Sequence, residues 1–385
     1  MKKRFVAAGF ILFSFMLPLK ATAAQFSGIY VFGDSLSDAG NVYNSTIDPN
    51  TGIGFPPPPY SDGNFSNGPI WIDELAKKLQ LDSSPTLYTD VAKGAAPKNG
   101  INYAFGGATS IDKNTISPLL PGFQQQIAAF TTPLFPTKNA DSNALYVLWT
   151  GANDYLPTNA DPNYFKPFTD PKTTIDSLKI AIASLADVGA KNILVVNLPD
   201  LGQLPRANNL DPTFPLPPET PATQVSQALT DLTKEHNSDL SDAIADLNKV
   251  LNPDVKLMSL DVSSVLADII YDTEKMKGVK YGFKEVDKPC LVDPSCAANP
   301  SIQNQYFFWD GLHPTTAAHK ILGDYAFQQI EKSIQPVPEP STALGTVAIG
   351  AFGAAALLKR KRKQSLLKTV SLVPAGQSTH TKVES

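Results

Sequence analysis

A serine near the N-terminus stands where it could act as a nucleophile. Ser35 lies in the segment Gly33–Asn41 (Gly-Asp-Ser-Leu-Ser-Asp-Ala-Gly-Asn), directly after the apolar run 29–32. A serine at the point where a strand ends and a helix begins is held in place, and the backbone N–H groups around it point toward a ligand. Such a position suits a nucleophile whose reaction generates an oxyanion. The structural alternative is a helix N-cap.

Near the other end of the sequence, His313 has an aspartate three residues before it, Asp310. A histidine can remove the proton of a serine, and a carboxylate can hold the imidazole in the required tautomer. The other histidines lack this arrangement: His236 lies among polar residues of an expected helix and is expected on a solvated face, His319 lies inside the last expected helix, and His380 lies in a polar tail. Asp310 and His313 are therefore the candidate partners of the serine, with a loop and helix cap as the structural alternative.

Two further segments could donate hydrogen bonds to an oxyanion. Residues 102–108 (Asn-Tyr-Ala-Phe-Gly-Gly-Ala) contain two glycines, which let the backbone approach a substrate and donate an N–H. Asn153 follows the next apolar run, and its neutral amide could stabilise an oxyanion without changing the charge of the site. A tight turn and a cap residue are the structural alternatives.

Five short apolar runs are typical of strands that are buried on both faces of a sheet. They span 28–32, 101–105, 145–149, 193–197 and 255–260, and stretches of helical periodicity occur at 70–79, 174–188, 223–251 and 316–334. This alternation predicts one α/β domain at 25–335, a three-layer α/β/α sandwich with a central parallel sheet of about five strands. Ligands of such sheets bind at the carboxyl ends of the strands, which is where the candidate residues lie.

The composition excludes several classes of function. The chain has 36 acidic and 32 basic residues, a net charge of −4, and no basic patch that would indicate a nucleic-acid partner. Its two cysteines and four histidines show no zinc-binding spacing, so we expect neither a metal nor a cofactor. Cys290 and Cys296 would pair in an exported chain, and free thiols are the alternative.

The N-terminus is typical of a secretory signal peptide over residues 1–24. A basic start, Lys2-Lys3-Arg4, precedes an apolar stretch, and small residues at 21–24 offer a cleavage site. An N-terminal membrane anchor is the alternative.

The C-terminus carries a second apolar segment, at 341–358, between Pro338-Glu339-Pro340 and the basic cluster 359–363. Its length matches the hydrocarbon core of a membrane, and the basic cluster favours a cytoplasmic end. Residues 336–363 resemble the PEP-CTERM sorting signal of Gram-negative bacteria, which implies processing by an exosortase-type protease and transfer to the cell surface. A plain membrane anchor is the alternative. We expect the polar tail 364–385 to be disordered.

Taken together, the four blocks around Ser35, Asn102–Ala108, Asn153 and Asp310–His313 resemble the SGNH hydrolases, also called the GDSL lipase/esterase family. The resemblance covers nearly the whole predicted domain and implies a flavodoxin-like fold. Pro58-Pro59-Tyr60 is also similar to the longer, lipase-like members. The α/β-hydrolase fold is disfavoured because the chain has no Gly-x-Ser-x-Gly nucleophile elbow.

The resemblance implies a role for each residue. Ser35 is the nucleophile, His313 the general base and then acid, and Asp310 the residue that orients it. The oxyanion hole consists of the Ser35 N–H, the Gly107 N–H and the Asn153 side chain, where Gly107 rather than its neighbour follows from counting along the block. Two aspartates beside the nucleophile, Asp34 and Asp38, are expected to be structural.

We therefore expect an exported serine esterase or lipase that acts on an ester or lipid substrate through an acyl-serine. Its location would be the periplasm or cell surface of a Gram-negative-type bacterium, with membrane contact through the C-terminal segment. One alternative is a phospholipase or acyltransferase that uses the same site, with residues Phe55 to Tyr60 lining an acyl groove. A second is a non-catalytic surface protein on the same fold.

Overall fold

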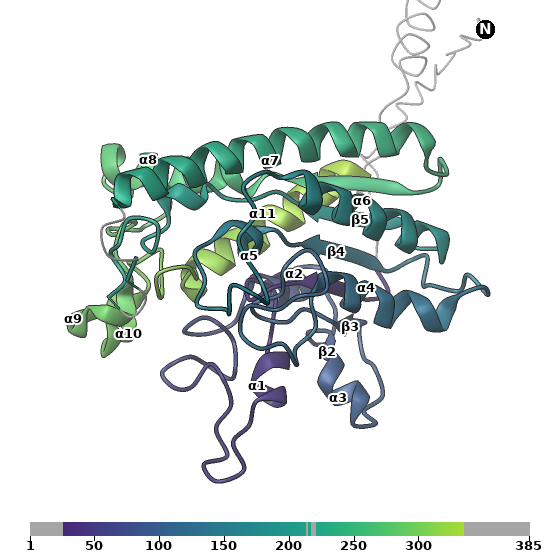
Figure 1. The fold of residues 1–385 in the computed structure, drawn as a ribbon, viewed down its shortest axis with the longest axis horizontal. Coiled ribbons are helices and arrows are strands. Elements are labelled where there is room, and N and C mark those ends of the chain that lie inside the picture. The colour runs from purple at the N-terminus through teal and green to yellow at the C-terminus, as the bar shows by residue number, and fades with distance from the viewer. Residues whose placement is uncertain (1–25, 213–214, 217–220, 335–385) are drawn as a thin grey trace, which may run out of the picture. The chain divides into compact units, whose positions relative to one another are not determined.

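The computed structural model describes residues 26–334 except 213–214 and 217–220. The predicted signal peptide at 1–24, the sorting segment at 336–363 and the tail at 364–385 lie outside the described residues. Figure 1 shows helices on both sides of one open sheet. This arrangement confirms the predicted three-layer α/β/α sandwich.

The sheet has six parallel strands rather than five, in the order β2-β3-β1-β4-β5-β6. They are β1 (Ile29–Gly33), β2 (Thr86–Leu87), β3 (Ile101–Asn102), β4 (Leu145–Trp149), β5 (Asn192–Val196) and β6 (Lys256–Leu260). The sequence analysis missed β2 because two half-buried residues carry no apolar run. The other five strands follow the flavodoxin-like order, in which β1 is the point where the connections reverse direction.

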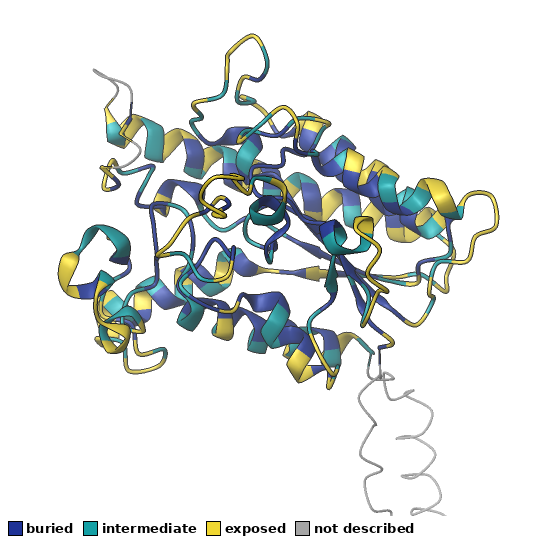
Figure 2. Cartoon of the chain, turned by 90° about the horizontal axis from the view of Figure 1, so that it is seen from below, coloured by how far each residue is buried: buried dark blue, intermediate teal, exposed yellow. Residues whose placement is uncertain are grey.

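The helices divide into two layers, and the strands β1, β3, β4 and β5 between them are largely buried (Figure 2). One face of the sheet packs against α2 (Trp71–Lys78), α8 (Val262–Met276) and α11 (Thr316–Ile334). The other packs against α4 (Phe123–Thr131), α6 (Lys172–Asp187) and α7 (Ala222–Val250). Alternate side chains of each strand enter opposite layers, so Val147 lies in the first core and Leu148 in the second. Because both faces of the sheet are covered by helices, its central strands are continuous apolar runs and do not alternate between apolar and polar residues.

The remaining helices are short and lie in the connections. They are α1 (Asn41–Ser45), α3 (Tyr88–Ala92), α5 (Ala152–Tyr155), α9 (Pro294–Ala297) and α10 (Pro300–Gln303), with 3-10 turns at Thr132–Leu134, Leu201–Gln203 and Cys290–Val292. The segment 278–306 packs around a disulfide between Cys290 and Cys296 and the indole of Trp309.

The environment predicted for His236 is wrong, because this side chain is fully buried. It lies on the inner face of α7 with Leu229, Thr233, Leu240 and Ala243, which recur at helical spacing. Burial lowers the pKa of His236 to about 4, and its Nδ1 lies 2.8 Å from the hydroxyl of Tyr155. The prediction relied on the polar residues next to His236 in sequence and did not use the helical spacing of His236 with these buried residues.

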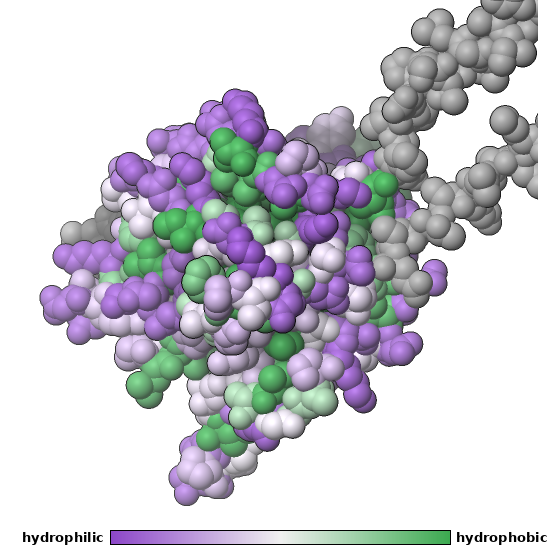
Figure 3. All heavy atoms as spheres, turned by 90° about the vertical axis from the view of Figure 1, so that its right-hand side faces the viewer, coloured by the Kyte–Doolittle hydropathy of each residue, from purple (hydrophilic) through white to green (hydrophobic). Residues whose placement is uncertain are grey.

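The surface mixes polar and apolar side chains on the face shown in Figure 3. Leu119 and Val279, at 93% and 82% exposure, are among the most exposed apolar residues. Within the part of the chain that the structure describes, no helix combines the length and apolar character needed to cross a membrane.

Candidate active site

The nucleophile candidate is held by the end of β1. Gly33 ends the strand, and the amides of Ser37 and Asp38 donate to the carbonyl of Asp34, which closes a turn around Ser35. The side chain of Asp38 is fully buried and accepts hydrogen bonds from the amides of Gly40, Asn41 and Val42, at 2.8, 2.6 and 3.1 Å. One carboxylate therefore fixes the turn and the start of α1 together.

The same carboxylate reaches the glycine block. Asp38 Oδ2 accepts the amide of Gly106 at 2.9 Å. Asn41 donates to the carbonyls of Asn102 and Ala104, and Asn102 donates back to the carbonyl of Ser37. These buried side-chain bonds fix the nucleophile turn against the loop after β3.

The histidine lies on the opposite side of the serine, in the loop before α11. Its Nε2 is 2.7 Å from the Ser35 Oγ, and its Nδ1 is 2.6 Å from Asp310 Oδ2. Both distances are within the range of strong hydrogen bonds. The structure thus brings Ser35, His313 and Asp310 together across 278 residues of sequence.

Asp310 accepts four hydrogen bonds. The amides of Leu312 and His313 donate to its Oδ1 at 2.8 and 2.7 Å, while His313 Nδ1 and the Tyr60 hydroxyl approach Oδ2, each at 2.6 Å. Burial alone would raise the pKa of this carboxyl, but the charge of His313 and the hydrogen bonds outweigh it and hold the pKa below the ordinary value. The group is therefore an anion suited to stabilising an imidazolium.

Sequence reasoning missed the contact of Tyr60 with Asp310. The sequence predicts a place for Tyr60 in the block similar to lipase-like members and in a possible acyl groove. In the structure its hydroxyl donates to the carboxylate and its ring packs edge-on against Trp309. Burial, followed by the charge of Asp310, raises the pKa of Tyr60, so the phenol stays protonated as a donor. Phe65, from the same long loop, lies with its ring centre 5.2 Å from that of His313. The Pro-Pro-Tyr sequence marked Tyr60 as a residue of interest. It could not identify Asp310 as the hydrogen-bond partner, because the two residues are 250 positions apart.

The three predicted oxyanion donors come from the ends of neighbouring strands. Ser35 follows β1, Gly107 lies in the loop after β3, and Asn153 lies in α5 after β4; all three border one cleft. Gly107 has a φ of +75°, which favours glycine, while the Gly106 amide is already bonded to Asp38. Asn153 donates one amide hydrogen to the carbonyl of Ala108 at 3.1 Å, which orients its side chain.

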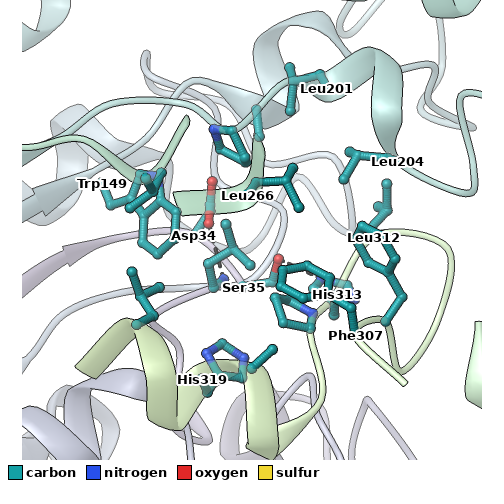
Figure 4. A pocket seen from close by; sticks show the side chains of 18 of the residues that line it. Asp34, Ser35, Trp149, Leu201, Leu204, Leu266, Phe307, Leu312, His313 and His319 are labelled. Carbon is teal, nitrogen blue, oxygen red and sulfur yellow. Dashed lines mark hydrogen bonds between the residues drawn. The ribbon is translucent and has the colours of Figure 1, made fainter. Parts of the chain in front are cut away.

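The buried carboxyl of Asp34 accepts fewer hydrogen bonds than that of Asp38. Its Oδ1 accepts the Leu36 amide at 3.1 Å, and its Oδ2 has no hydrogen-bond partner among the described residues. Burial raises the pKa of the Asp34 carboxyl to about 7, against the opposing effect of that hydrogen bond and of His313. Figure 4 shows Asp34 and Trp149 near Ser35.

Comparison with known proteins identifies the family of the chain. Residues 29–326 match the family model of GDSL-like lipases/acylhydrolases, and residues 336–362 match the PEP-CTERM protein-sorting motif. A phosphatidylcholine-sterol acyltransferase of Aeromonas hydrophila is 28% identical over 352 residues, which cover 80% of this chain and 92% of that protein. A GDSL esterase/lipase of Arabidopsis thaliana is 26% identical, with 82% of this chain and 88% of that protein covered.

Among solved structures, a catalytic mutant of the acetylxylan esterase Axe2 from Geobacillus stearothermophilus aligns with a TM-score of 0.39 and 13% identity, covering 79% of this chain and 94% of that chain. The family model, in contrast, spans most of the sequence and includes all four residue blocks. The family resemblance drawn from those blocks is thereby confirmed. The chain belongs to the GDSL-like lipase/acylhydrolase family.

Proposed function

We propose that the chain is an exported serine hydrolase that cleaves carboxylic esters through an acyl-serine intermediate. The observation that carries the proposal is the hydrogen-bonded series from Ser35 Oγ through His313 to Asp310, with distances of 2.7 and 2.6 Å. The series lies where the sheet connections reverse direction, the usual ligand position in such folds.

In the first half of the reaction, Ser35 Oγ attacks the ester carbonyl carbon while His313 Nε2 takes its proton. Asp310 stabilises the resulting imidazolium through Nδ1. The carbonyl oxygen becomes an oxyanion, for which the N–H groups of Ser35 and Gly107 and the second amide hydrogen of Asn153 are the proposed donors. The intermediate then collapses: the carbon–oxygen bond to the alcohol breaks, and the alcohol leaves with the proton from His313.

In the second half, water replaces the alcohol. His313 takes a proton from the water as its oxygen attacks the acyl carbon, and the same donors hold the second oxyanion. Breaking the bond to Ser35 releases the carboxylic acid, and His313 returns the proton to Oγ. Every step uses groups that the described residues supply.

The test is hydrolysis of p-nitrophenyl acetate and butyrate by the wild type, Ser35→Ala and the exposed control Ser45→Ala. We expect Ser35→Ala to lower kcat by a factor of about 10⁴ or more, because members of such a site act as a unit. Ser45→Ala should match the wild type. Wild-type turnover by Ser35→Ala would refute the assignment, and absence of turnover in all three proteins would favour the non-catalytic alternative.

A second candidate is acyl transfer or phospholipid cleavage at the same site. The observation that favours it is the similarity to the Aeromonas hydrophila protein, whose name describes transfer of an acyl group from phosphatidylcholine to a sterol. An acceptor alcohol would take the place of water in the second half of the reaction. Product analysis with a phosphatidylcholine and a competing alcohol separates the two, since a new ester indicates transfer and free acid indicates hydrolysis.

The ends of the chain support export. The match at 336–362 indicates sorting through a PEP-CTERM pathway, and we propose cleavage there by an exosortase-type enzyme after membrane contact through 341–358. Residues 1–24 would act as the signal peptide. Fractionation of cells that express the chain with and without residues 337–363 tests this, and an identical distribution of both forms would contradict it.

A further inference from the structure

An apolar cavity lies on one side of Ser35, between the sheet and the layer formed by α8 and α11. Its volume is about 80 Å³, and its walls include Leu266 and Ile269 of α8 and Ala318 and Leu322 of α11. Figure 4 shows Leu204, Leu266 and Phe307 around Ser35 and His313. These side chains are buried, so the cavity presents hydrocarbon to whatever is attached to the serine.

A second and larger space also borders Ser35. This cleft has a volume of about 410 Å³, and its walls include Thr158, Asn159, Arg206 and Asp211. Its walls also include Phe55, Phe65 and Ile116, so the cleft combines apolar surface with hydroxyl, amide and charged groups, where the cavity offers mainly hydrocarbon. The cavity and the cleft meet at Ser35, Asn153 and His313, which border both.

We infer that the apolar cavity binds the acyl group and the larger, more polar cleft binds the alcohol, which makes the substrates esters of short unbranched aliphatic acids with a larger alcohol. This inference rests on the proposed function, because it assumes that the ester carbonyl lies at Ser35. A polyhydroxylated alcohol in the cavity would leave its hydroxyls desolvated and without partners, whereas an alkyl chain gains from burial there.

The size of the cavity sets the length of the acyl group. At about 80 Å³ it is roughly half the volume of an engineered protein cavity that holds one benzene ring. It accommodates a chain of a few carbons, and a palmitoyl chain would have to displace the packed side chains of α8. Close packing makes such displacement unfavourable.

The one acidic side chain in the cavity wall does not conflict with an alkyl ligand. Burial raises the pKa of Asp34 to about 7, so this carboxyl is largely neutral in mildly acidic solution. A neutral carboxyl is far less unfavourable beside hydrocarbon than a carboxylate.

The experiment compares two ester series on the mature domain. The first varies the acid: p-nitrophenyl acetate, butyrate, octanoate and palmitate. The second varies the alcohol: ethyl, butyl and octyl acetate. We expect kcat/KM to fall at least tenfold from butyrate to octanoate, and to change less than threefold along the acetates, because the cleft is larger than the cavity.

Two cavity variants test the same claim in opposite directions. Leu266→Ala should raise the octanoate-to-butyrate ratio of kcat/KM at least tenfold, since each newly buried methylene is worth roughly fourfold. Ala318→Val adds carbon atoms to the cavity and should lower the butyrate-to-acetate ratio. Tyr271→Ala, an exposed position of α8 (59%), is the matched control and should leave both series unchanged. Thermal melts show which variants are folded.

The outcomes separate this inference from the proposed function. Ester hydrolysis that depends on Ser35, combined with chain-length ratios that neither cavity variant changes, overturns the inference and leaves the function standing. A Leu266→Ala effect on the alcohol series alone shows that the ester binds the other way round, which also overturns it. Absence of Ser35-dependent hydrolysis refutes the proposed function itself. If Leu266→Ala does not fold, Ala318→Val still decides the question.

Discussion

The two halves of the site are held in different ways. On the nucleophile side, Ser35 follows a central strand, and Asp38 ties its turn to the loop after β3 through four backbone amides. On the base side, His313 lies in a loop supported by segments far away in sequence. The proposed nucleophile is therefore positioned by the sheet and the loop after β3, and the proposed base by tertiary contacts between loops.

The contacts of the base loop come from three segments, two of which are distant in sequence. Tyr60 donates to Asp310, the Arg206 amide donates to the carbonyl of Gly311, and the Cys290 amide donates to the carbonyl of Phe308. We therefore expect substitutions on the nucleophile side to lower mainly the stability of the fold. Substitutions in the support of the base should lower mainly the activity of a protein that still folds.

The largest effect should come from the base itself. His313→Ala should lower kcat on p-nitrophenyl butyrate by a factor of about 10⁴ or more, because the variant loses the imidazole that lies 2.7 Å from Ser35 Oγ. Asp310→Asn should be milder, since the imidazole remains while its orientation is lost. His313→Ala should melt within a few degrees of the wild type, and a large loss of stability in this variant would contradict the comparison.

A change on the nucleophile side should act through stability. Asp38→Asn places an amide group against four backbone donors, and each buried donor left without a partner costs about 1–3 kcal/mol. We expect a clear drop in the urea midpoint of unfolding together with lower activity. The exposed Asp82→Asn is the control. Unchanged stability of Asp38→Asn would show that this carboxylate does not hold the turn.

A smaller and more specific effect is expected from Tyr60→Phe. Removing the hydroxyl leaves Asp310 with one donor fewer, so the carboxylate attracts the imidazolium proton more strongly. The acid limb of the kcat/KM profile should move to higher pH, and kcat should fall by roughly tenfold with KM little changed. Tyr271→Phe should reproduce the wild-type profile. An unshifted pH profile would mean that Tyr60 only fills space.

The smallest effect concerns the pH dependence of stability. The pKa of Asp34 is raised from 3.8 to about 7, so over this range the folded state keeps a proton that the unfolded chain releases. Its stabilisation is complete below about pH 4 and is lost as the pH rises through about 7. Asp34→Asn should therefore show a smaller fall in Tm from pH 5 to 8 than the wild type.

Some of that fall should remain in the variant. Burial also raises the pKa of Asp38 and Asp154, each to about 6, and these groups titrate with the same sign. Equal Tm profiles for wild type and Asp34→Asn would show that Asp34 titrates as an ordinary carboxyl.

The comparison also explains how far the sequence could be interpreted. The long strands and the two-sided burial of the sheet followed from apolar runs, and the block around Ser35 pointed to a strand-end nucleophile because it directly follows one of these runs. The contact of Tyr60 with Asp310 could not be predicted, since it joins loops 250 residues apart. The helix α8 was missed, and with it the wall of the acyl cavity that contains Leu266 and Ile269.

The central claim is that Ser35 is the nucleophile, and covalent labelling tests it most directly. The folded mature domain is treated with a fluorophosphonate and digested, and the modified peptide is identified by mass spectrometry. The account predicts a single adduct on Ser35 that is lost in Ser35→Ala and strongly slowed in His313→Ala. An adduct on another residue, or ester hydrolysis that persists without any label on Ser35, would contradict it.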